Sequence, residues 1–363
     1  MKYFLVTGEK SGDQHAGKLI RAIKDNDKKA VFKGVGGDSS SDAGMKLLFH
    51  NQGIAVMGFF EVILKAIRLK KWLGQCKRNL IVFNPDLVIL IDSGGFNLPL
   101  AQFATKRGYK VLYFIPPKVW AWGSWRARRL IKSTNRIVVS LPFEVELFDR
   151  LGVKTDYMGS PVANYLELAT ISGLETNTEH IALLPGSRRQ EIKYHLPLMI
   201  KVAKSLPSWK FVVVAVRELE ETYTKSVLPE NVIISYETAS SILKTSRAAI
   251  VASGTATLEA CLLNVPQVVV YKTHPLNYLV ARVLIKTRFI SLVNLMLNKQ
   301  VVKELIQGEA NPEKLKQELS RLITDEGYRN NVIANYRKVI TQLGNMNAYQ
   351  ATANLIKGMI AYA

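Results

Sequence analysis

The chain has 363 residues, more than one hydrophobic core usually holds, so we expect two α/β domains. Its 48% apolar content is that of a globular protein, and it has no uninterrupted apolar run long enough to span a membrane. Two cysteines exclude a disulfide framework, and the five histidines show no metal-ligand spacing. The 49 basic and 29 acidic residues give a net charge of +20, which attracts polyanions such as nucleic acid or an anionic lipid surface.

Short β-branched runs alternate with helical patterns along the chain, which is typical of parallel sheets. In the first half, strands are expected at 3–7, 30–35, 86–91, 110–115, 136–140 and 155–158. A second series follows a linker-like polar stretch, at 181–184, 211–216, 232–235, 248–252 and 267–271. We therefore predict two Rossmann-like doubly wound domains, 1–165 and 166–342. A final helical segment, 343–363, is expected to pack back on the first domain or on a second subunit.

A glycine-containing turn follows the first expected strand and precedes a helix expected over 16–23. Ligands of open parallel sheets bind beyond the carboxyl ends of the strands, and glycine lets a backbone approach them closely. The turn lacks the G-x-G-x-x-G fingerprint, so a plain strand-to-helix turn explains it nearly as well as a ligand loop. Its residues are Gly8, Glu9, Lys10, Ser11, Gly12 and Asp13.

A carboxylate, Asp92, follows the very apolar strand expected at 86–91. A half-buried aspartate at the edge of a sheet has the raised basicity that a general base needs. An aspartate at this position also suits the cap of the next helix. The sequence leaves these two interpretations open.

A Gly-Ser turn with two arginines opens the second half, where Gly186 and Ser187 precede Arg188. Such a turn can hold a diphosphate, while an arginine neutralises the charge that grows on a leaving phosphate. The alternative is a solvated capping box formed by Ser187 and Gln190.

A second turn of this kind, Ser253-Gly254-Thr255, joins a strand to a helix. A helix that begins there directs unpaired N–H groups and the positive end of its dipole at one spot, which suits a phosphate. Glu259 lies about one turn further on and can accept hydrogen bonds from the two hydroxyls of a ribose. The two turns together predict a nucleotide-diphosphate site.

An amphipathic pattern covers residues 59–73, where large apolar side chains are interleaved with basic ones. Such a face can lie in a membrane interface or accept acyl chains, and it can also simply pack on a sheet. The apolar residues in question are Phe59, Phe60, Ile63, Leu64, Ile67 and Trp72.

Eight motifs, in order along nearly the whole chain, resemble those of lipid A disaccharide synthases. They are GEKSGD (8–13), VMGFFEV (56–62), IDSGGFN (91–97), VWAW (119–122), LPFE (141–144), LLPGSR (183–188), ASGTATLE (252–259) and SLVN (291–294). The resemblance implies a GT-B fold, in which two domains face a cleft and C-terminal helices cross back. It also implies an inverting glycosyltransferase that joins UDP-2,3-diacylglucosamine to 2,3-diacylglucosamine 1-phosphate (lipid X) and releases UDP. No metal and no cofactor are implied, and the enzyme is expected on the cytoplasmic face of the inner membrane as a peripheral protein.

The resemblance also assigns roles to residues. It makes Asp92 the base that deprotonates the 6-hydroxyl of the acceptor, and it places the turn at 8–13 beside the acceptor. The donor residues that it implies are Gly186, Ser187, Arg188, Ser253, Gly254, Thr255, Glu259 and Asn294. The chain departs from the usual family pattern at Lys10, Gly94, Gly95, Ser160, Val293 and Lys303, which leaves substrate preference open.

Two other functions share some of these features. The Ser-Gly-Thr turn with a following glutamate also occurs in UDP-N-acetylglucosamine 2-epimerases and in GT-B transferases with soluble acceptors. The charge of +20 suits a nucleic-acid-binding protein, but the chain contains no recognised binding motif for nucleic acid. We therefore expect no nucleic-acid partner.

Overall fold

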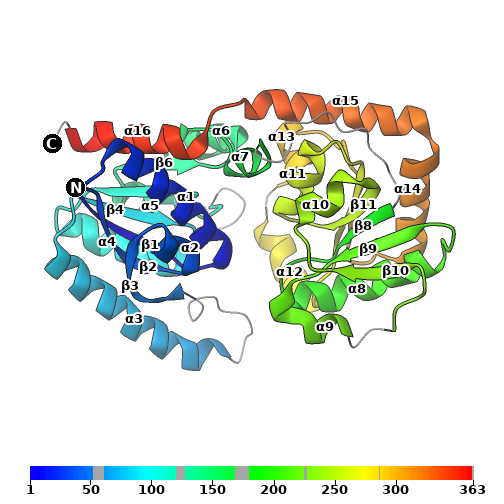
Figure 1. Ribbon diagram of the computed structural model, residues 1–363, viewed down its shortest axis with the longest axis horizontal. Helices are drawn as coiled ribbons and strands as arrows, with labels where there is room; N and C mark the ends of the chain where they lie inside the picture. Colours follow the sequence, from blue (N-terminus) through cyan, green and yellow to red (C-terminus); the bar gives the residue numbers. More distant parts are fainter. Residues whose placement is uncertain (52–60, 120–126, 168–179, 225–226, 286, 362–363) are drawn as a thin grey trace. The chain divides into compact units, whose positions relative to one another are not determined.

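The computed structural model describes the chain except for residues 52–60, 120–126, 168–179, 225–226, 286 and 362–363 (Figure 1). Within the helices, the side chains of residues 61–67, 165–167, 224 and 361 are also outside the description. The chain forms two compact units. Unit 1 comprises Met1–Pro161 and Asn345–Ala363, and unit 2 comprises Val162–Gly344.

Unit 1 is built on a seven-stranded sheet with the strand order β3-β2-β1-β4-β5-β6-β7. All neighbouring strands in it are parallel. Its strands are β1 (Lys2–Thr7), β2 (Val31–Gly36), β3 (Met45–His50), β4 (Leu87–Ile91), β5 (Val111–Phe114), β6 (Arg136–Val139) and β7 (Asp156–Tyr157). Its helices are α1 (Lys10–Asn26), α2 (Asp38–Asp42), α3 (Glu61–Phe83), α4 (Gly94–Lys106), α5 (Ala127–Lys132), α6 (Pro142–Asp149) and α16 (Ala348–Ala361).

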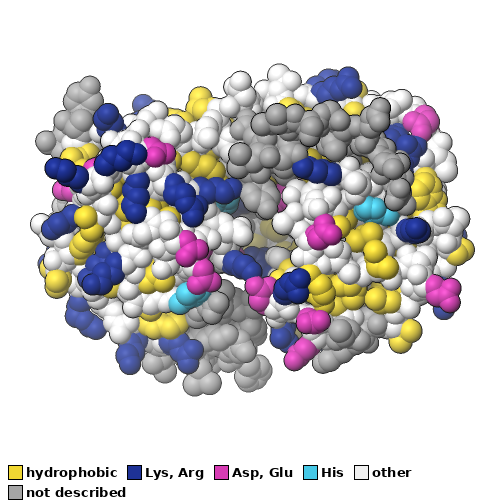
Figure 2. Space-filling view, viewed as in Figure 1, with side chains coloured by type: hydrophobic (Ala, Val, Ile, Leu, Met, Phe, Trp, Pro, Cys, Tyr) yellow, Lys and Arg dark blue, Asp and Glu magenta, His cyan; other side chains and the backbone are white. Residues whose placement is uncertain are grey.

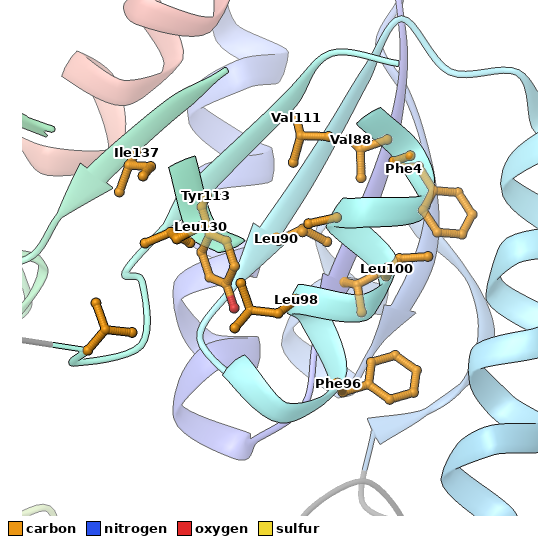
Figure 3. Packing of buried hydrophobic residues seen from close by; sticks show 14 of the residues in the cluster. Phe4, Val88, Leu90, Phe96, Leu98, Leu100, Val111, Tyr113, Leu130 and Ile137 are labelled. Carbon is orange, nitrogen blue, oxygen red and sulfur yellow. The ribbon is translucent and has the colours of Figure 1, made fainter. Parts of the chain in front are cut away.

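The sheet of unit 1 carries a hydrophobic core on each face, because successive side chains of a strand point to opposite sides. In β1, Tyr3 and Leu5 pack with α1 and α16, whereas Phe4 and Val6 pack with α3 and α4. Figure 3 shows the second core, in which α4 contributes Phe96, Leu98 and Leu100 and the strands contribute Phe4, Val88, Leu90, Val111 and Tyr113. Helices therefore cover both faces, so that a ligand can reach the sheet at its edges and strand ends.

The C-terminal helix α16 belongs to unit 1, although it follows unit 2 in the chain (Figure 1). Tyr349 of α16 hydrogen-bonds His15 of α1 through its hydroxyl at 2.9 Å and packs edge-on against Phe114. Gly159 has a φ of +93°, and a Cβ there would lie 2.2 Å from the carbonyl oxygen of Met346. The return of the chain to unit 1 thus requires a glycine at this position.

Unit 2 repeats the design with a six-stranded parallel sheet in the order β10-β9-β8-β11-β12-β13. Its strands are β8 (His180–Leu184), β9 (Lys210–Val214), β10 (Val232–Ser235), β11 (Ser246–Ala252), β12 (Gln267–Tyr271) and β13 (Glu304–Ile306). Its helices are α8 (Arg189–Lys204), α9 (Glu220–Thr224), α10 (Ala239–Lys244), α11 (Thr255–Leu262), α12 (Pro275–Leu284), α13 (Leu292–Leu297), α14 (Pro312–Thr324) and α15 (Glu326–Leu343), with a 3₁₀ turn at Arg217–Leu219 and α7 (Pro161–Glu167) at the boundary.

The predicted fold class is confirmed, since both units are doubly wound parallel α/β structures. Two strands, β3 and β13, were not expected from the sequence. The helix expected over 16–23 begins earlier, at Lys10, so most of the predicted turn at 8–13 is helical. No described helix has both the length and the apolar character that crossing a bilayer requires.

Candidate functional site

Each sheet has one place where the strand order reverses direction. In unit 1 this switch point lies between β1 and β4, and in unit 2 it lies between β8 and β11. The connections after these strands run to opposite faces of the sheet, and ligands of open parallel sheets bind in the crevice that results. The four segments singled out from the sequence follow these four strands: the turn at 8–13 follows β1, Asp92 follows β4, Gly186 follows β8 and Ser253 follows β11.

Asp92 and Ser93 have φ values of +52° and +46°, which non-glycine residues seldom adopt. The strained backbone is held from two sides. The hydroxyl of Tyr113 donates to the carbonyl oxygen of Asp92 at 2.6 Å, and Nδ2 of Asn97 donates to the same oxygen at 2.9 Å. Strain of this kind persists only where the surroundings enforce it, and it is concentrated at functional sites.

The partners of Asp92 are buried and have fixed hydrogen-bonding roles. Burial, together with the nearby Asp92 carboxylate, holds the pKa of Tyr113 well above its usual range, so its hydroxyl stays a donor. The N-cap of α4 is Ser93, whose side chain makes no capping hydrogen bond. The N-cap position of α4 is thus held by Ser93, one residue after Asp92.

The first turn of α1 lies beside Asp92. A Cβ on Gly12 would be 2.3 Å from Oγ1 of Thr7 and 3.9 Å from Cβ of Asp92, so the glycine lets α1 approach the ends of β1 and β4. Gly8 is buried, Glu9 is the half-buried N-cap and Ser11 is exposed. The structure thus brings this predicted turn and Asp92 together.

Asp13, which was expected on the acceptor side, instead holds unit 1 together. Its Oδ1 accepts hydrogen bonds from the backbone of Gly37 at 2.7 Å and of Ser40 at 3.2 Å, and from the Ser40 hydroxyl. Its Oδ2 accepts from the backbone of Ser39 at 2.9 Å. The carboxylate is buried and caps α2, so we assign it a structural role.

The predicted membrane or acyl-chain residues lie on or before α3. Phe59 and Phe60 fall outside the described residues, as do the side chains of Ile63, Leu64 and Ile67. Trp72 is described: it stacks on Phe49 with ring centroids 5.1 Å apart and packs against the core. For Trp72 the core-packing alternative is the correct one.

In unit 2, the turn after β8 is organised around Glu191. Gly186 has a φ of +115°, and a Cβ there would lie 2.6 Å from Cβ of Glu191. The backbone N–H of Ser187 donates to Oε2 of Glu191 at 3.0 Å, and Arg188 pairs with Oε1 at 3.3 Å. The alternative of a capping box formed by Ser187 and Gln190 is wrong, because α8 has Arg188 as its N-cap and no side-chain cap.

His195 joins this turn to the loop after β12. Its Nδ1 donates to the carbonyl oxygen of Pro185 at 2.9 Å, and its Nε2 accepts from the backbone N–H of Lys272 at 2.9 Å. These two bonds require the neutral ring with the proton on Nδ1. Burial lowers the pKa of His195, which favours the same form.

The turn after β11 has an open N-terminus. Gly254 is the N-cap of α11, which has no side-chain cap, and a Cβ on Gly254 would have no neighbour within 4 Å. The Ser253 hydroxyl donates to the carbonyl oxygen of Ile290 at 2.9 Å, and the Thr257 hydroxyl donates to that of Gly254 at 2.7 Å. Thr255 is exposed. The first amides of α11 are therefore presented to solvent by a turn that is itself firmly held.

Glu259 lies one helical turn beyond Thr255 on α11. Its side chain is half-buried, and burial raises the pKa of its carboxyl group. Within the part of the chain that the structure describes, this carboxylate makes no hydrogen bond and no ion pair. A half-buried carboxylate without a protein partner is costly unless a ligand supplies the hydrogen bonds.

Asn294, expected to contact the donor, is instead fully engaged within unit 2. Its Nδ2 donates to the carbonyl oxygen of Val302 and to Oε1 of Glu304, and its Oδ1 accepts from the backbone of Val301 and Val302. We therefore assign Asn294 a structural role. Glu304 was missed by the sequence analysis, yet it also binds the backbone of Ile290 and Ser291, next to the Ser253 hydroxyl bond.

The sequence model of the lipid-A-disaccharide synthetase family matches residues 3–358. The chain belongs to this family. A lipid-A-disaccharide synthase from Trichlorobacter lovleyi is 33% identical over 99% of this chain and 97% of its own length. One from Syntrophus aciditrophicus is 36% identical over 88% and 87%, and one from Coxiella burnetii is 32% identical over 98% of both chains.

Solved structures similar to this synthetase have the GT-B fold. The S. aureus MnaA–UDP structure superimposes with a TM-score of 0.69 at 12% identity, over 100% of this chain and 97% of the other. The glycotransferase of kitacinnamycin gives 0.64 at 14% identity, over 98% of both chains. At this identity the likeness concerns the fold. The family makes the protein a glycosyltransferase of lipid A biosynthesis. Among the residues with described placement, no group of three His, Cys, Asp or Glu side chains is arranged to hold a metal.

Replacing His195 with alanine leaves the carbonyl of Pro185 and the N–H of Lys272 without their partner, so we expect H195A to lower the free energy of unfolding by about 1–3 kcal/mol. Because burial lowers the pKa of His195, unfolding takes up a proton. The contribution of His195 to the free energy of unfolding of the wild-type protein therefore decreases as the pH falls below about 6.5. Urea unfolding at several pH values measures both effects. Lys193→Ala, at an exposed position of the same helix, is the control, and equal stability of the two variants would contradict the assignment.

Proposed function

We propose that this synthetase joins UDP-2,3-diacylglucosamine to 2,3-diacylglucosamine 1-phosphate. The 6-hydroxyl of the acceptor loses its proton and bonds to the anomeric carbon of the donor, whose bond to the β-phosphate oxygen of UDP breaks. The products are the β-1,6-linked disaccharide 1-phosphate and UDP. The observation that carries the proposal is the family match over residues 3–358, which includes every residue assigned a role below.

Asp92 is the proposed base. Its backbone is fixed by hydrogen bonds from Tyr113 and Asn97 to its carbonyl oxygen. A base must be held within hydrogen-bonding reach of the proton that it removes, and a rigid strand end serves this better than a mobile loop. Gly12 and the exposed Ser11 beside it are the proposed acceptor contacts.

The proposed donor site combines α11 and Arg188. The open amides at Gly254 and Thr255 suit the diphosphate, because the uncapped start of a helix binds anions. Glu259, without a partner among the described residues, suits the two ribose hydroxyls. Arg188 is about half-exposed and pairs with the Glu191 carboxylate at the start of α8, where a doubly charged diphosphate can recruit it. It would then neutralise the charge that develops on UDP as it leaves.

We further propose that the enzyme works at the cytoplasmic surface of the inner membrane, where acylated sugars reside. Figure 2 shows many Lys and Arg side chains and few Asp and Glu side chains on the visible face of unit 1. In α3, Arg68, Lys70 and Lys71 are exposed. Basic residues of this kind draw a protein to anionic lipids, each contributing about 1 kcal/mol near the surface. A homodimer is compatible with this arrangement and is a separate proposal.

The pure protein, given the two acylated sugars, should form a disaccharide that mass spectrometry detects. Asp92→Asn should lower turnover by about 10²–10⁴-fold, since it removes the base while keeping the size of the side chain. Its affinity for UDP, measured by calorimetry, should stay the same because UDP binds in unit 2. Asp42→Asn, an equal change of charge at an exposed position, is the control. Absence of the disaccharide with wild-type protein would overturn the function, and undiminished turnover of the variant would remove Asp92 from the role of base.

Glu259→Gln should weaken the binding of UDP-N-acetylglucosamine by about tenfold to a hundredfold, because a charged acceptor for the ribose is lost. Burial raises the pKa of Glu259, so the wild-type carboxylate takes up its proton at a higher pH than an exposed one. Wild-type affinity should therefore begin to decline at a higher pH than an exposed carboxylate would allow, while that of the variant stays level as the pH is lowered. Titration calorimetry at several pH values measures this, and parallel pH profiles would contradict the ribose assignment.

Gly254→Ala should weaken UDP binding by about tenfold or more without destabilising the fold. The added Cβ would meet no protein atom, but it would occupy the space in which the diphosphate approaches the amides of α11. Gly308→Ala, whose Cβ would also have no neighbour within 4 Å, is the matched control in the same unit. Thermal unfolding measures the stability of both variants, and calorimetry measures their affinity for UDP. Wild-type affinity in Gly254→Ala would place the diphosphate elsewhere.

A further inference from the structure

The helix α12, labelled in Figure 1, has its apolar residues at one helical face. The apolar positions follow the i, i+3, i+4, i+7, i+8 pattern that normally identifies the side of a helix facing a core. They are Leu276, Leu279, Val280, Val283 and Leu284.

This face is exposed instead of packed. Leu276 is 66% exposed, Leu279 60%, Val280 59% and Val283 76%, and no residue of α12 is buried. By contrast, α14 in the same unit has a similar apolar period and buries four residues, including Leu315 and Leu319. Tyr278 and Ala281, on the other side of α12, are half-buried. Contiguous exposed apolar surface of this kind marks an interaction site.

The stretch of sequence that contains α12 carries charges of one sign only. The sequence contains no Asp or Glu from Ala260 to Lys303, a segment that includes the whole helix and both of its flanks. Arg282 on the helix and Arg288 just after it are exposed. An apolar stripe with only basic residues beside it is the composition of helices that lie in the interface of an anionic membrane.

We propose that α12 docks on the surface of a bilayer that contains anionic phospholipid. The leucine and valine side chains enter the boundary between head groups and acyl chains, and Arg282 and Arg288 bind lipid phosphates. A second copy of this chain is a poorer occupant, because two such faces would bring like charges together. The inference rests on the proposed function in one respect: acylated sugar substrates require contact with such a bilayer. It adds a membrane contact in unit 2 to the basic surface of unit 1.

Co-sedimentation with vesicles tests the proposal, using phosphatidylglycerol mixed into phosphatidylcholine and phosphatidylcholine alone. The double variant Leu279→Ser, Val283→Ser should bind the anionic vesicles at least tenfold more weakly than wild type. The matched control is Ile233→Ser, Val227→Ser, which removes side chains that are 60% and 94% exposed elsewhere in unit 2, and it should bind as wild type does. The double variant Arg282→Gln, Arg288→Gln should lose most of the preference for anionic vesicles. Thermal unfolding confirms that each variant is folded.

Two outcomes would overturn the proposal. One is equal vesicle binding by wild type and by the Leu279 and Val283 double variant. The other is a wild-type dimer in analytical ultracentrifugation that this variant dissociates, which would assign the face to self-association. UDP affinity of the wild-type protein is measured alongside, because it reports on the donor site alone. If the wild-type protein binds vesicles but does not bind UDP, the result would count against the proposed function and leave the α12 assignment standing.

Discussion

Parallel strand pairing is the constraint on which both units depend. Every neighbouring pair among the described strands is parallel, so each connection must cross a face of the sheet before the next strand begins. These crossings bury both faces under helices and bring all the strand carboxyl ends to one edge. Where the strand order reverses, two connections separate and leave the edge open. The meeting of Gly12 with Asp92, from opposite ends of the chain's first hundred residues, follows directly from this topology.

Polar residues at these edges differ in whether their hydrogen-bond partners lie within the protein. Residues with internal partners stabilise the edge, and residues without them are available to a ligand. Asp13, Asn294 and His195 lie close to the strand ends and are polar, yet their side chains find their partners inside the protein. The carboxylate of Glu259 finds none among the described residues, and α11 begins at Gly254 with no side-chain cap. Leaving a half-buried polar group unpaired costs free energy, and this supports the proposal that a ligand supplies the missing hydrogen bonds. If proximity to a switch point were the only criterion, all of these residues would count as candidate ligand contacts.

The sequence predicted much of the fold because β-branched runs and glycine turns are local signals. It missed β3, whose residues 45–50 include no β-branched side chain, and β13, which has only three residues. Within the candidate site, residue types and turns were predictable but partners were not. Asp13 was expected on the acceptor side. Its carboxylate instead accepts hydrogen bonds from residues more than twenty positions away, which a local sequence pattern cannot predict. Glu304 escaped notice for the same reason, since its role depends on contacts with residues 290–294.

Local sequence also cannot predict whether an apolar helix face is buried. The apolar period is similar in α12 and α14, yet the apolar face of α12 is exposed and that of α14 is buried. Periodicity establishes that a helix has an apolar face, but the direction of that face depends on what the rest of the fold leaves uncovered. The charges along the segment carry the missing information. Acidic residues are interspersed through α14 and α15, where the apolar faces are buried, whereas the segment around α12 has none. A helix whose apolar side faced another protein would gain from opposite charges at its rim. The segment 260–303 has basic residues and no acidic ones, which supports the proposal that α12 meets the phosphates of a lipid surface.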